Sequence, residues 1–155
     1  MTETINLQEL DPLFKDEVAA EPGCQHLRRC FGCGVCTATC PVSELVPGFS
    51  PSQIIRQILY GQRAALLGSP TLWYCARCAR CSFQCPQDVR FLDIIQGLRN
   101  LAVRDGVVSA ERLARLERGE ALIQELRRRL IGEILSGPET KEVKESLARL
   151  TGELE

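Results

Sequence analysis

Two copies of one cysteine spacing constrain this chain more than any other feature of its sequence. Each copy sets successive cysteines three, three and four residues apart and places a proline directly after the fourth. The copies are Cys30, Cys33, Cys36 and Cys40–Pro41, and then Cys75, Cys78, Cys81 and Cys85–Pro86. They hold eight of the nine cysteines, so the fold must be one that presents two groups of thiols.

This spacing is typical of iron–sulfur ligation. A [4Fe-4S] cluster takes four soft thiolates, one for each iron, and cysteines three residues apart let one tight loop supply three of them. The proline redirects the chain after the fourth cysteine, which in the two-cluster pattern binds the other cluster. We therefore predict two [4Fe-4S] clusters, the first held by Cys30, Cys33, Cys36 and Cys85 and the second by Cys75, Cys78, Cys81 and Cys40.

Other uses of the cysteines fit less well. Four-cysteine zinc sites usually separate two C-x2-C pairs by a longer loop. The first residues carry no basic and apolar leader, and no apolar run reaches the roughly 18 residues of a membrane span. We therefore expect a cytoplasmic chain without a direct membrane span, in which thiols stay reduced. A formal net charge of −1 argues against nucleic acid as a partner.

Apolar spacing and helix signals predict an all-α fold with no strand of any length. Asp11 and Pro12 suit the start of a helix over Pro12–Ala20, with Leu13, Phe14 and Val18 as its apolar residues. Further helices are expected over 51–60, 62–67, from 70 toward Cys75, and from Phe91 until Gly106.

The repeat is larger than the cysteines. Each run is followed by its proline and then by an amphipathic helix, with Ile54–Ile55 and Ile94–Ile95 at corresponding places. Two such units facing each other predict a pseudo-two-fold helical domain around two clusters. We divide the chain into a lead-in over 1–24, a two-cluster domain over 25–108 and a tail over 109–155.

The tail has a different composition. It holds nine Lys or Arg and ten Glu. Its apolar residues predict one helix stopped by Ser136–Gly137–Pro138 and a last one marked by Val143, Leu147, Leu150 and Leu154. These helices either fold back on the domain or dock a partner, and we favour partner contact for at least one of them.

Several residues beside the runs leave alternatives open. Cys24 is a small buried hydrophobe or a spare ligand. His26, the only histidine, makes a hydrogen bond near a cluster or has no role there. Gly32 and Gly34 let the backbone approach sulfur. Five arginines raise cluster potentials, contact a partner or are simply solvated: Arg28, Arg29, Arg77, Arg80 and Arg90.

No catalytic constellation is visible. The sequence has no G-x-G-x-x-G motif for a dinucleotide, and one histidine leaves few options for a nucleophile with its base. We therefore predict a non-catalytic electron-transfer subunit of an oxidoreductase.

The chain resembles the C-type subunits of heterodisulfide reductases. The resemblance rests on both ligand runs, on Leu72–Trp73–Tyr74 before Cys75, and on the stretch from Cys85–Pro86 to Leu101–Ala102, and it covers residues 12–106. It implies an α-helical ferredoxin fold in a cytoplasmic complex. There an A-type subunit with flavin and clusters would pass electrons through the C-type subunit to a catalytic, cysteine-rich B-type subunit.

The resemblance leaves the substrate open. In methanogens the family acts on the heterodisulfide of coenzymes M and B, whereas bacterial relatives serve sulfur metabolism. Arginine outnumbers lysine 16 to 3, which weakly favours a GC-rich bacterial source. Alternative functions are a free ferredoxin-like carrier and the iron–sulfur subunit of a membrane- or quinone-linked dehydrogenase.

Overall fold

The computed structural model describes residues 8, 10–137 and 143–152, and every regular element within them is a helix. The all-α prediction is therefore confirmed. The chain forms two compact units, Met1–Val107 and Val108–Glu155. The finer division into 1–24, 25–108 and 109–155 stays a prediction.

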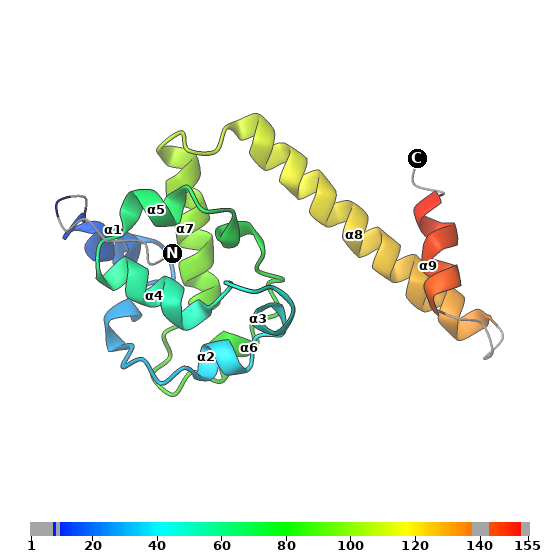
Figure 1. The fold of residues 1–155 in the computed structure, drawn as a ribbon, viewed down its shortest axis with the longest axis horizontal. Helices are drawn as coiled ribbons and strands as arrows, with labels where there is room; N and C mark the ends of the chain where they lie inside the picture. The colour runs from blue at the N-terminus through cyan, green and yellow to red at the C-terminus, as the bar shows by residue number, and fades with distance from the viewer. Residues whose placement is uncertain (1–7, 9, 138–142, 153–155) are drawn as a thin grey trace. The chain divides into compact units, whose positions relative to one another are not determined.

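Four helices build the core of the first unit. They are α1 (Phe14–Ala20), α4 (Pro51–Leu59), α5 (Arg63–Leu67) and α7 (Phe91–Arg104). The longest, α7, packs against α1 and α5, while α4 packs against the same two helices (Figure 1). The fully buried side chains come from all four, and burial of this apolar surface is what stabilises so small a unit: Phe14, Val18, Ile58, Leu66, Ile94, Leu98 and Leu101.

The start of α1 corrects the sequence prediction. The helix begins at Phe14, two residues later than expected, because Asp11 forms a turn in which its carboxylate accepts the Leu13 N–H at 2.9 Å. Leu13 is 69% exposed and so does not share the buried face of Phe14 and Val18. A proline at position 12 suits such a turn as well as a first helical turn.

The helix expected over 51–60 is confirmed as α4. Ser50 Oγ accepts the Gln53 N–H at 3.4 Å, Pro51 occupies the first turn, and the helix ends just before Gly61. The main-chain oxygen of Gly61 then accepts the Asp11 N–H at 2.8 Å, which joins the end of this helix to the lead-in. In the next connection Ser69 caps a short 3-10 turn, η3 (Pro70–Trp73).

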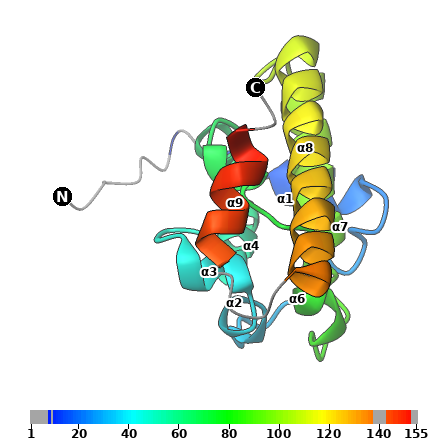
Figure 2. The ribbon, with the colours of Figure 1, turned by 90° about the vertical axis from the view of Figure 1, so that its right-hand side faces the viewer.

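The sequence analysis missed four short elements, all in or beside the cysteine runs. They are η2 (Leu27–Arg29), α2 (Val35–Ala38), α3 (Pro41–Leu45) and α6 (Arg80–Phe83). Helices this short cannot display an apolar period, so spacing alone cannot reveal them. The α2 and α6 helices hold corresponding positions of the two runs and pack side by side (Figures 1 and 2).

The second unit is a helical hairpin of α8 (Ala110–Ser136) and α9 (Val143–Gly152), which lie against each other in both views (Figures 1 and 2). Ser109 Oγ caps α8, and Leu150 is the most buried apolar residue of α9. Arg149 bonds Glu133 across the pair at 2.6 Å. The predicted helices are confirmed here, although Pro138 and Leu154 lie outside the described residues. None of the described helices is long and apolar enough to cross a membrane.

Candidate iron–sulfur centre

The first cysteine run is a loop bent by left-handed backbone. Cys30 ends η2, and Gly32 and Gly34 adopt φ of 76° and 80° before α2 begins at Val35. Positive φ is the region that glycine enters without steric cost. The chain can therefore wind tightly from Cys30 to Cys36 and present three sulfurs on the inside of one curve.

The second run repeats this backbone without glycine. Arg77 and Ala79, which correspond to Gly32 and Gly34, have φ of 53° and 61°. A side chain in this region costs roughly 1–2 kcal/mol per residue. The two loops therefore share one backbone shape. The second loop adopts it although Arg77 and Ala79 disfavour left-handed φ, which indicates that the surrounding structure holds it there.

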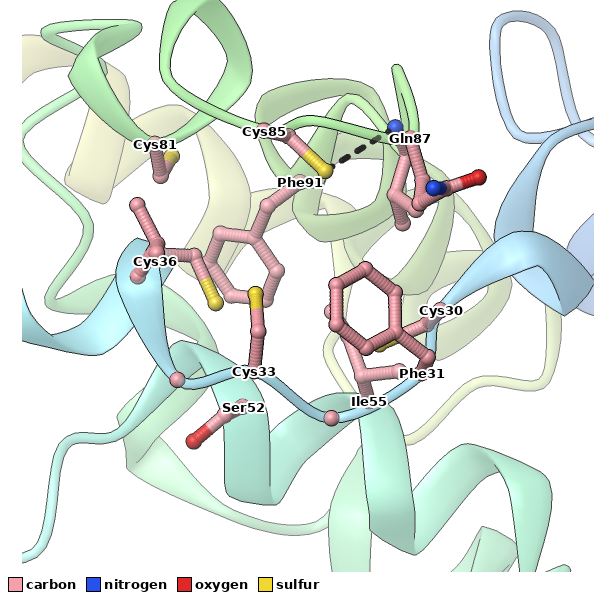
Figure 3. Close-up of a pocket in the computed structure, with 14 residues that line it drawn as sticks. Cys30, Phe31, Cys33, Cys36, Ser52, Ile55, Cys81, Cys85, Gln87 and Phe91 are labelled. Atoms are coloured by element: carbon pink, nitrogen blue, oxygen red, sulfur yellow. Dashed lines mark hydrogen bonds between the residues drawn. The ribbon is translucent and has the colours of Figure 1, made fainter.

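One cavity unites the first run with the last cysteine of the second. It is lined by Cys30, Cys33, Cys36 and Cys85, together with Cys81. Figure 3 shows the Cys85 side chain projecting from one wall of the cavity toward the opposite wall, which the loop of Cys33 and Cys36 forms. The apolar wall of the cavity, formed by Ile55, Val89 and Phe91, is almost fully buried.

The other four cysteines also gather across the two runs. Cys40 is close enough for its charge to act on both Cys75 and Cys81, and Cys78 acts on the same two thiols. The structure thus brings Cys40 to the second run and Cys85 to the first, while Cys81 borders both groups.

Burial disfavours free thiolates in both groups. Burial is the largest cause that raises the pKa of Cys36 and Cys75, and it raises the pKa of Cys81 to about 11, with the neighbouring thiols adding to the shift. Thiolates at these places are costly unless positive charge compensates for them, which bound iron would supply. Among the described residues no three His, Cys, Asp or Glu side chains converge tightly enough for a single metal ion. The all-thiol donor set around a cavity fits an iron–sulfur cluster.

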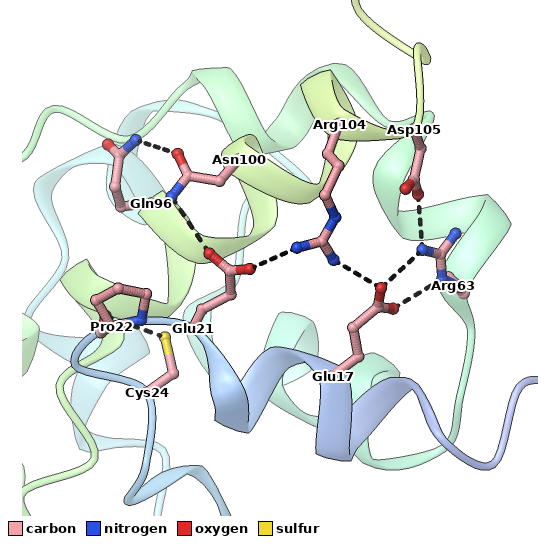
Figure 4. A network of polar contacts seen from close by, with 9 residues as sticks. All are labelled: Glu17, Glu21, Pro22, Cys24, Arg63, Gln96, Asn100, Arg104 and Asp105. Atoms are coloured by element: carbon pink, nitrogen blue, oxygen red, sulfur yellow. Dashed lines mark hydrogen bonds and ion pairs between the residues drawn. The ribbon is translucent and has the colours of Figure 1, made fainter.

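Cys24 lies apart from both groups. Its side chain is 0% exposed, it packs beneath Gly97 of α7, and burial raises the pKa of its thiol to about 12. Its Sγ lies 3.8 Å from the carbonyl oxygen of Pro22 (Figure 4). Such a residue is a small hydrophobe, the first of the two interpretations that the sequence left open.

Several residues that flank the cysteines make hydrogen bonds or ion pairs. His26 Nδ1 lies 3.1 Å from both the main-chain oxygen and the carboxylate of Asp88, and Arg90 bonds the same carboxylate at 3.0 Å. The bond from Arg90, reinforced by His26, lowers the pKa of Asp88. Arg28 pairs with Asp16 of α1. Arg77 and Arg80 flank Cys78 in the second run, and the possible roles of these arginines stay open.

The sequence analysis overlooked Arg99. This side chain is only 5% exposed, donates from Nε to the Leu72 carbonyl at 2.8 Å, and lies 5.1 Å from the centre of the Trp73 ring. Its charge lowers the pKa of Cys75, although burial outweighs that effect. Arg99 follows Leu98 in the apolar stripe of α7, which consists of Phe91, Ile94, Ile95, Leu98 and Leu101. From the sequence it suggests a polar-face residue, and only the fold shows that it points toward η3 and Cys75.

Comparison with known proteins agrees with this geometry. Residues 29–90 match the family of 4Fe-4S dicluster domains. Over 100 residues, 64% of this chain, it is 34% identical to the C-type subunit of the H(2):CoB-CoM heterodisulfide,ferredoxin reductase of Methanothermobacter marburgensis, covering 53% of that protein. Over 97 residues, 62% of this chain, it is 39% identical to the C-type subunit of the ferredoxin:CoB-CoM heterodisulfide reductase of Methanosarcina acetivorans, covering 38% of it.

A third relative extends the match slightly. It is a C-type iron-sulfur subunit of the CoB–CoM heterodisulfide reductase of Methanocaldococcus jannaschii, 32% identical over 109 residues, which is 66% of this chain and 58% of that protein. The chain therefore spans about half the length of the curated relatives it matches. Over the matched residues the chain is thus similar to heterodisulfide reductase C-type subunits, and residues 29–90 within that stretch match the 4Fe-4S dicluster domain family.

Proposed function

We propose that this chain is an electron-transfer subunit that holds two [4Fe-4S] clusters with eight cysteines in two crossed sets. Cys30, Cys33, Cys36 and Cys85 form one set, and Cys75, Cys78, Cys81 and Cys40 form the other. The observation that carries the proposal is the shared cavity, which Cys85 and Cys81 of the second run line together with three cysteines of the first. Each bound cluster would accept and release single electrons.

Crossed ligation would make the two halves of the domain interdependent. Cys40 and Cys85 each extend from one run to the other, and the packed helices α2 and α6 carry Cys36 and Cys81 between them. The two clusters would then be neighbours, which is what transfer between them requires. The buried side chains of Ile55 and Phe91 would exclude water from one wall of the cavity.

The pattern of exposure also suits exchange with a partner. Cys33 and Cys78 hold the same position in the two runs, and both are exposed, whereas the other six thiols of the runs are partly or fully buried. Each set therefore has one corner at the surface. Phe31, which is 65% exposed, lies beside the first of these corners.

We further propose that the electrons pass between an A-type flavin and iron–sulfur subunit and a catalytic B-type subunit of a heterodisulfide reductase-like complex. The relatives are named as C-type subunits of such reductases, which supports a role in a multisubunit enzyme. A disulfide-reducing site would then lie on the partner.

Analysis of the anaerobically purified protein tests the cluster proposal. Two [4Fe-4S] clusters contain eight iron and eight sulfide per chain, so we expect contents of about eight each and the EPR spectrum of two interacting reduced clusters. Contents near four would contradict the second cluster, and zinc without sulfide would contradict both. Size-exclusion chromatography after co-expression with A- and B-type subunits tests the partners. A chain that elutes alone would favour a free ferredoxin-like carrier.

A further inference from the structure

The turn after Cys85 is strained in a way that its counterpart after Cys40 is not. Asp88 and Arg90 have φ of 51° and 52°, the left-handed region, which arginine rarely adopts and aspartate adopts only occasionally. After Cys40 the chain instead enters the regular helix α3. The two halves share the cysteine spacing and the proline, so the difference is specific to the second half. Strained backbone of this kind persists only where its surroundings hold it.

The strained turn directs a hydrogen-bond donor at a ligand sulfur. The Val89 N–H donates to Cys85 Sγ at 3.4 Å, a bond that Figure 3 shows on the wall of the cavity. The side chains of Val89 and Phe91 are each 2% exposed and line the same cavity. At the corresponding place in the first half, the Glu44 N–H donates to the main-chain oxygen of Cys40. The corresponding backbone N–H groups thus donate to the sulfur of Cys85 but to the main-chain oxygen of Cys40.

His26 holds this turn from the other half of the domain. Its Nδ1 lies 3.1 Å from the main-chain oxygen of Asp88 and 3.1 Å from the Asp88 carboxylate. Because both partners are acceptors, Nδ1 carries the proton and donates it. His26 also precedes η2, the single turn that leads into Cys30. One side chain therefore links the segment before Cys30 to the segment after Cys85, two members of one proposed ligand set.

We propose that His26 is a positioning residue that holds the Asp88–Arg90 turn so that the Val89 N–H points at Cys85 Sγ, which raises the reduction potential of one cluster. The inference rests on the proposed function, since it needs Cys85 to be a ligand. A hydrogen bond to a ligand sulfur stabilises the more negative, reduced cluster. Only the cluster bound by Cys85 gains this bond from the turn, so the two clusters should differ in potential partly for this reason.

The test is an EPR-monitored redox titration of the full-length holoprotein. His26→Leu removes the donor, and His26→Asn replaces the ring Nδ1–H with an uncharged amide N–H. Gln25→Ala, an exposed neighbour, serves as the matched control. We expect His26→Leu to lower the midpoint potential of one cluster only, so that less than half of it is reduced at the wild-type midpoint. His26→Asn should restore the wild-type value largely, and Gln25→Ala should leave both midpoints unchanged.

Three results would overturn the inference. In the first, His26→Leu leaves both midpoint potentials unchanged. In the second, His26→Leu shifts both midpoint potentials equally. In the third, His26→Asn shifts the midpoint potential as far as His26→Leu does. If His26→Leu does not retain its clusters, His26→Ala takes its place. Alanine removes the same donor with a smaller side chain, so the same cluster should shift in the same direction, and no shift would again overturn the inference. Iron and sulfide contents are measured first. A wild-type chain without two clusters would refute the proposed function as well, whereas two clusters insensitive to His26 would refute this inference alone.

Discussion

At the scale of single residues, the two cysteine loops differ in how easily their backbone is formed. Gly34 and Ala79 hold the same place in the two runs, with φ of 80° and 61°. No protein atom lies within 4 Å of the position that a Cβ at Gly34 would occupy, so within the protein only the backbone preference would count. Substitutions at these two positions therefore measure the free-energy cost of placing a side chain on left-handed backbone.

Exchanging these two residues should change stability in opposite directions. We expect Ala79→Gly to stabilise the holoprotein by up to about 1 kcal/mol and Gly34→Ala to destabilise it by about 1–2 kcal/mol. Anaerobic thermal unfolding, followed by the cluster absorbance, measures both. A stabilising effect of Gly34→Ala would show that the loop does not keep its left-handed turn.

A substitution at Cys24 separates packing from ligation. Its thiol is fully buried and lies outside both cysteine groups. Cys24→Ala should leave the iron content unchanged and lower the free energy of unfolding by about 1 kcal/mol through the lost contacts. Iron content and the free energy of unfolding are both measured. Loss of about half the iron would instead show that Cys24 is a ligand.

At the scale of helices, a network of charged side chains joins α1, α5 and the end of α7 (Figure 4). Arg63 bonds Glu17 at 3.1 and 3.2 Å and Asp105 at 2.7 Å. Arg104 reaches Glu17 at 2.8 Å and Glu21 at 3.1 Å. The hydrogen bonds from Arg63, followed by those from Arg104, lower the pKa of Glu17 from its ordinary value of 4.5.

Removing the charge of Glu17 should loosen the first unit. Since Glu17 is about one-third exposed, we expect Glu17→Gln to cost only about 1 kcal/mol. A lowered pKa contributes stability that is fully present above 4.5 and is lost as pH falls through the lowered value. The difference from wild type should therefore be constant between about pH 6 and 8. Unfolding of the first unit measures it.

The matched control lies in the second unit. Glu125 also pairs with two arginines, Arg128 and Arg129, but along the exposed face of one helix. Glu125→Gln should leave unfolding of the first unit unchanged. A difference between wild type and Glu17→Gln that vanished at pH 8 would contradict the role assigned to this network.

The helix scale also shows what sequence can and cannot predict. The cap at Ser50 and the apolar residues of α7 are local signals, and the structure confirms the helices that they indicate. The turn at Asp11 competes with a helical cap made from the same residues, which explains the late start of α1. The contacts of Arg99 and of His26 span 27 and 62 residues, and no local pattern encodes contacts of that range.

At the scale of the whole molecule, the residues of the candidate iron–sulfur centre all belong to one compact unit. The eight cysteines of the runs and the residues around them lie within Met1–Val107, while the hairpin of α8 and α9 forms a unit of its own. A chain ending at Val107 should therefore retain the iron and sulfide content of the full chain. Loss of the clusters on truncation would show that the second unit is needed to form the site. Retention of clusters with loss of partner binding would support the docking role expected for the tail.

The central claim is that Cys40 and Cys85 each bind the cluster of the opposite run, and paired alanine variants test it most directly. Alanine cannot ligate iron, so two substitutions in one set should destroy one cluster, and one in each set should destroy both. Iron analysis of anaerobically purified protein gives the answer. We predict that Cys33→Ala with Cys85→Ala leaves about four iron atoms, whereas Cys78→Ala with Cys85→Ala leaves almost none. The reverse result, with iron retained only when Cys78 and Cys85 are changed together, would contradict crossed ligation.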